Sequence, residues 1–195
     1  LAMLNLSGEP GNFVSLYDPI IKSNGDVTIG KYIGASLKIE AVGNITTGII
    51  EIDNPETGAA VAGDPDADIL TSGRALILRA GVTIPPGNIQ EPGNIDDTYS
   101  SPASPDGSIT VGEITSNYDN LEPLTVILEA KGNIDTQRID AGGDINITSW
   151  NGTITSNGQD IEASLGSLNS EDVDYTGSID ISAAGDIAIQ RLSTS

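Results

Sequence analysis

The chain contains neither cysteine nor histidine among its 195 residues. Without cysteine it has no disulfide framework and no thiol nucleophile, so its compartment does not follow from redox chemistry. Without histidine it lacks Ser-His-Asp triads, histidine-ligated zinc sites and imidazole general bases. The commonest routes to hydrolytic and zinc-dependent catalysis are therefore excluded.

Basic residues are also scarce, because eight lysines and arginines stand against 28 aspartates and glutamates, for a formal net charge of -20. Nucleic acids require a basic surface, so we expect no nucleic-acid partner, and the same charge argues against anionic membranes. The excess of acid fits simple solubility, a preference for divalent cations or a saline extracellular setting. The charge alone does not choose among these.

Aromatic residues and long apolar runs are nearly absent. There is one tryptophan and one phenylalanine, and aliphatic residues make up most of the apolar set, which suits a solenoid better than a sandwich. The first eight residues lack the basic start and apolar stretch of a signal peptide, and no segment predicts membrane insertion. The chain does not begin with methionine, so we expect an internal piece of a longer protein.

One short phrase recurs: alternating aliphatic residues, an alanine, and a Gly-Asn or Gly-Asp pair. It occurs in full at 37–45, 126–134 and 179–187, and in shorter form at 76–82, 139–145 and 161–166. The alternation predicts a strand and the glycine pair predicts a tight corner. A repeated strand–corner–strand unit is typical of stacked β-coils, and Ala141, Ala163 and Ala183 fall about one coil of roughly 20 residues apart.

These patterns predict one all-β segment over residues 1–195, a β-solenoid with negligible helix. Lys38 and Glu40 alternate with aliphatic residues, so we expect both side chains to point outward from a strand. Irregular stretches rich in glycine, proline and acidic residues at about 51–72 and 85–107 predict loop insertions that leave the solenoid at corners, where extra length is tolerated.

The stretch from Asp18 to Gly43 resembles filamentous-haemagglutinin-like exoproteins, and more narrowly the large two-partner-secretion proteins of cyanobacteria. The likeness rests on its Gly-Asp-Val, Gly-Ala-Ser-Leu and Ala-x-Gly-Asn-Ile phrases. It implies a right-handed parallel β-helix that is secreted through an outer-membrane partner and displayed or released as an adhesive filament. The family's N-terminal secretion domain and its Asn-Pro-Asn-Gly type motif are missing, the nearest string being Asn54-Pro55-Glu56.

A candidate metal site lies at Asp64-Pro65-Asp66-Ala67-Asp68. Carboxylates at every second position resemble the opening of a calcium loop, in which hard oxygen ligands surround a hard cation. The match then breaks, because Ile69 replaces the glycine at position six and Ala75 replaces the glutamate at position twelve. Calcium bound by Asp64, Asp66 and Asp68 is therefore one hypothesis, and a solvated acidic loop is the other.

Outward strand positions carry the charged residues Glu40, Arg79, Glu129, Asp140 and Glu162. A glycosidase or polysaccharide lyase on a β-helix needs close acidic pairs, or a basic residue beside acidic ligands. If neighbouring coils align Glu40, Arg79 and Glu129, alternating charges stabilise the face without any catalysis. We therefore expect no enzyme and no catalytic residues.

Asparagine and aspartate recur beside the corner glycines. Such side chains bond nearby backbone amides, and equivalent positions in successive coils stack into a ladder. The residues expected to do so are Asp26, Asn44, Asn133, Asp144 and Asp186.

The sequence thus predicts a structural and adhesive extracellular protein, a segment of a secreted β-helical filament or cell-surface exoprotein. Its expected partners are further copies of the chain, end to end or along the rod, and cell-surface or extracellular polysaccharide. The alternative is a carbohydrate-active or calcium-dependent glycan-binding β-helix. No cofactor is expected apart from the calcium of that alternative.

Overall fold

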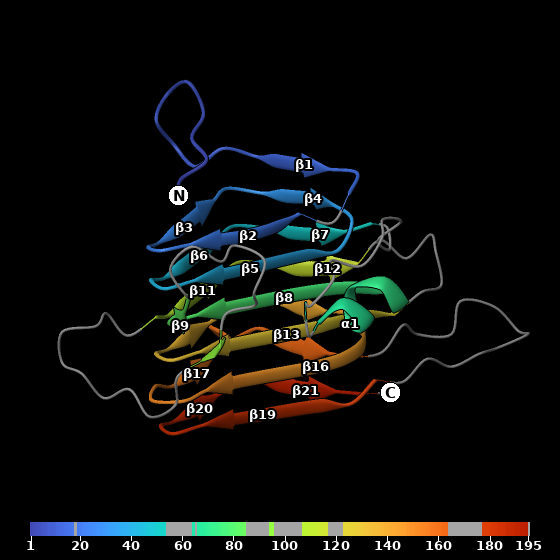
Figure 1. Cartoon of the computed structure of the whole chain (residues 1–195). Coiled ribbons are helices and arrows are strands. Elements are labelled where there is room, and N and C mark those ends of the chain that lie inside the picture. The colour runs from blue at the N-terminus through green and yellow to red at the C-terminus, as the bar shows by residue number, and fades with distance from the viewer. Residues whose placement is uncertain are drawn as a thin grey trace, which may run out of the picture.

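The computed structural model describes residues 1–17, 19–53, 64, 66–84, 94–95, 107–116, 123–163 and 177–194. Strands account for 54% of the structure and helix for about 4%, which confirms the predicted all-β class. Figure 1 shows the strands stacked in successive coils, from the N-terminal end at the top to the C-terminal end at the bottom.

Three parallel sheets run along the stack, and each coil adds one strand to each sheet in the order sheet 1, sheet 2, sheet 3. Sheet 1 holds the longest strands: β2 (Ile20–Ser23), β5 (Leu37–Ala41), β8 (Arg74–Ala80), β13 (Leu124–Ala130), β16 (Gly142–Ser149) and β19 (Ile179–Ala183). Sheet 2 comprises β3 (Val27–Ile29), β6 (Ile45–Thr47), β11 (Ile109–Val111), β14 (Ile134–Asp135), β17 (Ile154–Thr155) and β20 (Ile187–Ala188). Sheet 3 comprises β1 (Phe13–Ser15), β4 (Tyr32–Gly34), β7 (Ile50–Ile52), β12 (Ile114–Ser116), β15 (Ile139–Asp140), β18 (Asp160–Glu162) and β21 (Arg191–Ser193).

Two elements depart from the coils. The strands β9 (Val82–Thr83) and β10 (Asn94–Ile95) form a small antiparallel pair. The helix α1 (Ala67–Ser72) precedes β8 and was not predicted, because six residues are too short to show a helical periodicity. No helix in the described ranges is long and apolar enough to cross a membrane.

Half of the predicted insertion at 51–72 and most of the one at 85–107 lie outside the described residues. Of the stretch 51–72, the structure describes the end of β7 and the segment containing α1. Of 85–107, it describes β10 and Gly107. The string Asn54-Pro55-Glu56 also lies outside the described residues.

The core consists of aliphatic rows that run along the stack. In sheet 2, Ile45, Ile109, Ile134 and Ile154 pair in register and all four are fully buried. Sheet 3 repeats this arrangement with another row of isoleucines from β7 to β18. Burying one such side chain contributes about 1.5–3 kcal/mol, so each coil adds a similar increment of stability.

Backbones approach closely at the corner between sheets 2 and 3, where a column of glycines lies. A Cβ atom on Gly48 would lie 2.0 Å from the carbonyl oxygen of Gly30, and one on Gly112 would lie 2.8 Å from the carbonyl oxygen of Gly48. Both distances are far below any van der Waals contact. Glycine is therefore required at these corners by packing between coils.

The predicted corner ladder is present for most of its members. Asp26 Oδ1 accepts from the backbone N–H of Asn44 at 2.8 Å, and Asn44 Oδ1 accepts from that of Ser108 at 2.9 Å. Asn133 Oδ1 accepts from the N–H of Thr153 at 3.0 Å. Asp144 bonds Ser178 instead, which lies in the next coil at a different corner.

The alanines of the repeated phrase lie at two different corners of the coil. The alanines that end sheet 1 strands pair in register, as Ala41 does with Ala80, and Ala183 belongs to this set because it pairs with Ser149. Ala141 and Ala163 instead follow β15 and β18 and lead away from sheet 3. The spacing of roughly 20 residues between Ala163 and Ala183 is therefore not a coil period, because similar phrases occur at both corners.

Candidate functional site

Charged side chains line the outer face of sheet 1 in four successive coils. The register places Lys22 beside Glu40, Glu40 beside Arg79, and Arg79 beside Glu129. Lys22 Nζ lies 3.2 Å from a carboxylate oxygen of Glu40, and Arg79 Nε donates a hydrogen bond to Glu129. The predicted alternation of Glu40, Arg79 and Glu129 is confirmed, and Lys22 extends it by one coil.

Lys38 lies on the same outer face of sheet 1, beside these four charged side chains. Its ammonium group donates to Asp64 Oδ1 at 2.7 Å and to Asp66 Oδ2 at 2.6 Å. Glu40 Oε1 lies 3.5 Å from the same nitrogen. Asp66 also accepts two hydrogen bonds from the Arg79 guanidinium, one of them at 2.9 Å to Oδ1. Three cations and four carboxylates thus form one cluster on this face, which we call the charge cluster: Lys22, Lys38, Glu40, Asp64, Asp66, Arg79 and Glu129.

A short segment contributes Asp64 and Asp66 to the charge cluster and covers its other members. This strap consists of Asp64, Asp66 and α1, and α1 lies across the outer face of sheet 1 in Figure 1. Leu70 of the strap packs with Ala75 and Ile77 of β8 in a small apolar cluster separate from the main core. Lys38 and Glu40 point outward as predicted, but both are 0% exposed because the strap covers them.

The pKa values in the charge cluster follow from pairing under burial. Burial alone would raise the pKa of Asp66, but hydrogen bonds from Arg79 and Lys38 outweigh it and hold that pKa below its ordinary value. Burial alone would lower the pKa of Arg79, and the bonds to Asp66 and Glu129 reverse this and raise it. Both groups therefore stay ionised. Taking such charges out of water is costly, so their burial under the strap requires that nearly all of them are paired.

The three predicted calcium ligands do not converge on one point. Asp64 and Asp66 face the Lys38 ammonium group, whereas Asp68 lies in the first turn of α1 and is exposed. Within the described part of the chain, no group of three or more acidic side chains is arranged to hold a metal ion. Calcium binding by these residues stays a prediction.

The remaining outward acids lie in sheet 3. Asp140 of β15 and Glu162 of β18 are neighbours in register. Asp140 is almost fully buried and accepts a hydrogen bond from Arg138, which also lies 3.6 Å from Glu113. This arrangement is explained by ion pairing along the sheet, as expected for charges on neighbouring strands.

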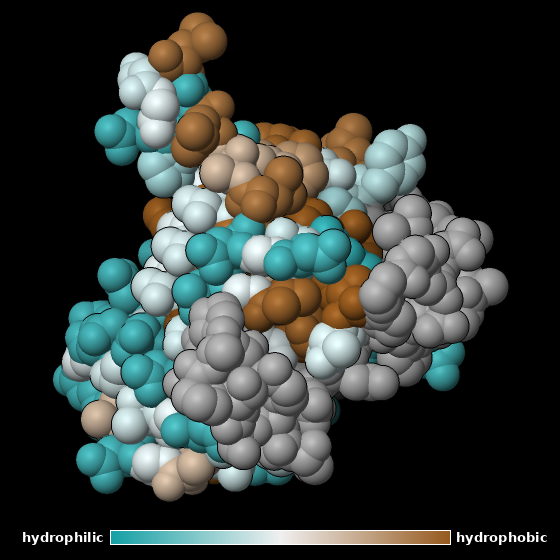
Figure 2. All heavy atoms as spheres, turned by 60° about the vertical axis from the view of Figure 1, so that its left-hand side comes forward, coloured by the Kyte–Doolittle hydropathy of each residue, from teal (hydrophilic) through white to brown (hydrophobic). Residues whose placement is uncertain are grey.

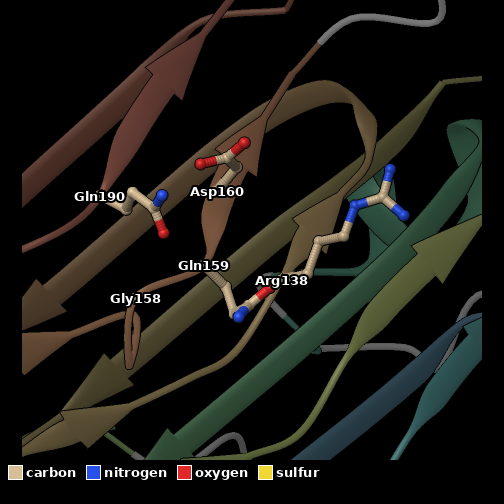
Figure 3. Close-up of a pocket in the computed structure, with 5 residues that line it drawn as sticks. All are labelled: Arg138, Gly158, Gln159, Asp160 and Gln190. Atoms are coloured by element: carbon tan, nitrogen blue, oxygen red, sulfur yellow. The ribbon is translucent and has the colours of Figure 1, made fainter.

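A polar depression of about 410 Å³ lies at the corner that leads into sheet 3. Its lining consists of Arg138, Gly158, Gln159, Asp160 and Gln190 (Figure 3). Gly158 has a φ of 76° and follows Asn157 at 48°, so a left-handed turn shapes one wall. The register places Gln159 beside Gln190 in the next coil, and both side chains are exposed. Sequence reasoning missed this site, because the glutamines lie 31 residues apart in the chain.

Exposed apolar side chains gather at the N-terminal end. Leu1, Leu4 and Leu6 are 58%, 57% and 110% exposed. They belong to a loop that stands off the top of the stack, where Figure 2 shows brown spheres projecting from the molecule. Val14 and Leu16 in and beside β1 add to the same end. Exposed apolar groups of this kind favour contact with another surface.

The geometry is therefore that of a stacked rod with a covered charge cluster, a polar depression and exposed apolar side chains at its N-terminal end. No protein-family model, curated protein or solved structure matches the chain.

Proposed function

We propose that the chain is a structural and adhesive segment of a secreted, right-handed β-helical exoprotein of the filamentous-haemagglutinin-like type. In this role the rod supplies reach and stiffness at the cell surface, and its loops and end supply contact. The proposal joins the resemblance of the stretch from Asp18 to Gly43 to the parallel three-sheet stack.

The observation that carries the proposal is the continuous stacking of parallel strands in the three sheets. Each sheet gains one strand per coil, from β2 to β19 in sheet 1 and from β3 to β20 in sheet 2. Adjacent strands lie about 4.8 Å apart, so rod length is proportional to the number of coils. A repeat of this kind is an economical way to build an extended object, because each coil buries its core against its neighbours.

Contacts of the rod are expected at two kinds of surface. The apolar end around Leu4 and Leu6 suits another apolar surface, and end-to-end or lateral association with further copies is part of this proposal. The net charge of -20 suits hydrated, polysaccharide-rich surroundings, because a strongly charged surface is well solvated.

Immunogold electron microscopy of the producing cells tests this function. Antibodies raised against the purified chain should label filaments or a surface layer outside the cell, and the culture medium should contain the antigen. Cells that lack the gene serve as the control. Labelling confined to the cytoplasm, or only dispersed monomers outside the cell, would contradict the proposal.

A second candidate function is glycan binding at the polar depression. Gln159 and Gln190 present amide groups that can donate to and accept from sugar hydroxyls, and Asp160 and Arg191 form a 3.0 Å ion pair beside them. A glycan array with the purified chain tests it. Binding that is lost in a Gln159→Ala, Gln190→Ala double variant and kept in an exposed control such as Asn151→Ala would favour this function. No binding to any glycan would contradict it.

The calcium-dependent form of this alternative has its own experiment. Calcium titration followed by thermal melting should raise the Tm of the wild type and leave that of an Asp64→Ala, Asp66→Ala double variant unchanged. Magnesium at equal ionic strength is the control. An unchanged Tm of the wild type would contradict calcium binding.

A further inference from the structure

We propose that Lys38 and Asp64 form an intramolecular isopeptide bond that fastens the strap to sheet 1. This inference does not depend on the proposed function, because it rests on the charge cluster alone. The bond would join the side-chain nitrogen of Lys38 in β5 to the side-chain carbon Cγ of Asp64, 26 residues further along the chain.

The reacting groups are already in contact and shielded from water. Lys38 Nζ lies 2.7 Å from Asp64 Oδ1, and the exposed fractions of the two side chains are 0% and 4%. A lysine amine becomes a nucleophile when it is desolvated, and a carboxyl carbon is the matching electrophile. Fixing two groups at contact distance replaces a bimolecular encounter by an intramolecular step, and well-oriented steps of this kind reach effective concentrations of about 10⁵–10⁸ M.

Asp64 is a better electrophile than Asp66. Both oxygens of Asp66 accept hydrogen bonds from Arg79, which hold that group as a carboxylate. Among the described residues, no arginine contacts Asp64. Its Oδ1 instead accepts the backbone N–H of Asp66 at 2.9 Å, a fixed donor that polarises the carboxyl group toward attack. The geometry therefore distinguishes two acids that the sequence presents alike.

Glu40 is positioned to carry a proton. Its Oε1 lies 3.5 Å from Lys38 Nζ and its side chain is fully buried. In the proposed step Nζ gives up two of its three protons and bonds to Cγ of Asp64, while one C–O bond of Asp64 breaks. Glu40 takes one proton from Nζ and returns it to the departing oxygen, which leaves as water with both protons. The net charge of the charge cluster is unchanged, and no other reactant is consumed.

The first experiment is the intact mass of the full chain under denaturing conditions. Linked protein is lighter than the sequence mass by about 18 Da, one water, whereas a salt bridge leaves the mass unchanged. Trypsin cleaves after lysine, but not after an acylated one. A linked chain should therefore yield residues 32–74 as one lightened peptide, and never residues 32–38 alone. The full sequence mass together with a free 32–38 peptide from the folded wild type would overturn the proposal.

Variants identify which residues the bond joins. Lys38→Arg and Asp64→Ala should give the full sequence mass, and Glu40→Gln should lower the linked fraction at least tenfold. Asp66→Asn should remain linked, and so should Asp68→Asn, which alters an exposed acid of the same strap and serves as the matched control. A linked Asp64→Ala variant beside an unlinked Asp66→Asn variant would overturn the assignment to Asp64. Because the wild-type digest is decisive by itself, a variant that fails to fold does not affect the test.

Discussion

Replacing Arg79 by alanine should destabilise the protein far more than replacing Arg191. The side chain of Arg79 is 14% exposed and forms ion pairs with Asp66 and Glu129, whose side chains are 6% and 29% exposed. Removing it leaves a buried carboxylate without its main partner, and breaking a buried pair costs about 3–5 kcal/mol. Arg191 pairs with Asp160 at 61% and 34% exposure. Such a surface pair contributes about 0–1 kcal/mol.

Urea unfolding followed by far-UV circular dichroism measures both free energies. Trp150, the only tryptophan, lies directly after β16 and gives a second signal by fluorescence. Coincident transitions from the two signals are needed before a two-state free energy is used, because stacked repeats can unfold in parts. An Arg79→Lys variant should fall between the wild type and Arg79→Ala, since lysine keeps the charge but loses the two-pronged contact. Equal losses for Arg79→Ala and Arg191→Ala would refute the reasoning.

Three further predictions concern pH, the core and the corners. The pKa of Asp66 is lowered in the folded state, so its stabilisation is fully present above the ordinary aspartate pKa of about 4 and is lost as pH falls through the folded value. Thermal melts from pH 6 to 2 should therefore show a smaller loss of Tm on acidification in Asp66→Asn than in the wild type; an identical loss would contradict this. Ile134→Ala should cost about 2–5 kcal/mol in urea unfolding, against under about 0.5 kcal/mol for the half-exposed Leu192→Ala, and similar costs would show that the isoleucine row is not the core. Gly48→Ala should lower Tm by several degrees because its Cβ meets a backbone oxygen, whereas Gly25→Ala has open space and should leave Tm nearly unchanged; equal melting temperatures would contradict the packing argument.

The local features of the fold could be predicted from the sequence. Alternation and corner residues predicted the strands and the ladder through Asp26 and Asn44, because both depend on neighbours a few residues away or on a repeated position in the next coil. The alternating row of Glu40, Arg79 and Glu129 followed from the same logic.

The features that the sequence did not reveal depend on non-local contacts. The sequence predicted that Lys38 and Glu40 point outward, but it did not show that the strap returns over them and buries them. For Asp64 and Asp66 the sequence suggested a calcium site or a solvated acidic loop, because nothing in their spacing shows that a lysine 26 residues before Asp64 lies against them. The coil register was misread at Ala183 because the phrases at two different corners look alike.

The charge cluster joins strands of four successive coils, β2, β5, β8 and β13, through side chains as well as through the backbone ladder. Towards the C-terminus, successive coils are joined by the strand hydrogen bonds and by single side-chain contacts, such as Arg191 with Asp160 and Asp144 with Ser178. We therefore expect a pulling force along the chain to unravel the coils after β13 before it separates the strands that the charge cluster joins. The cluster with its strap divides the rod mechanically into an extensible portion and a portion that resists tension.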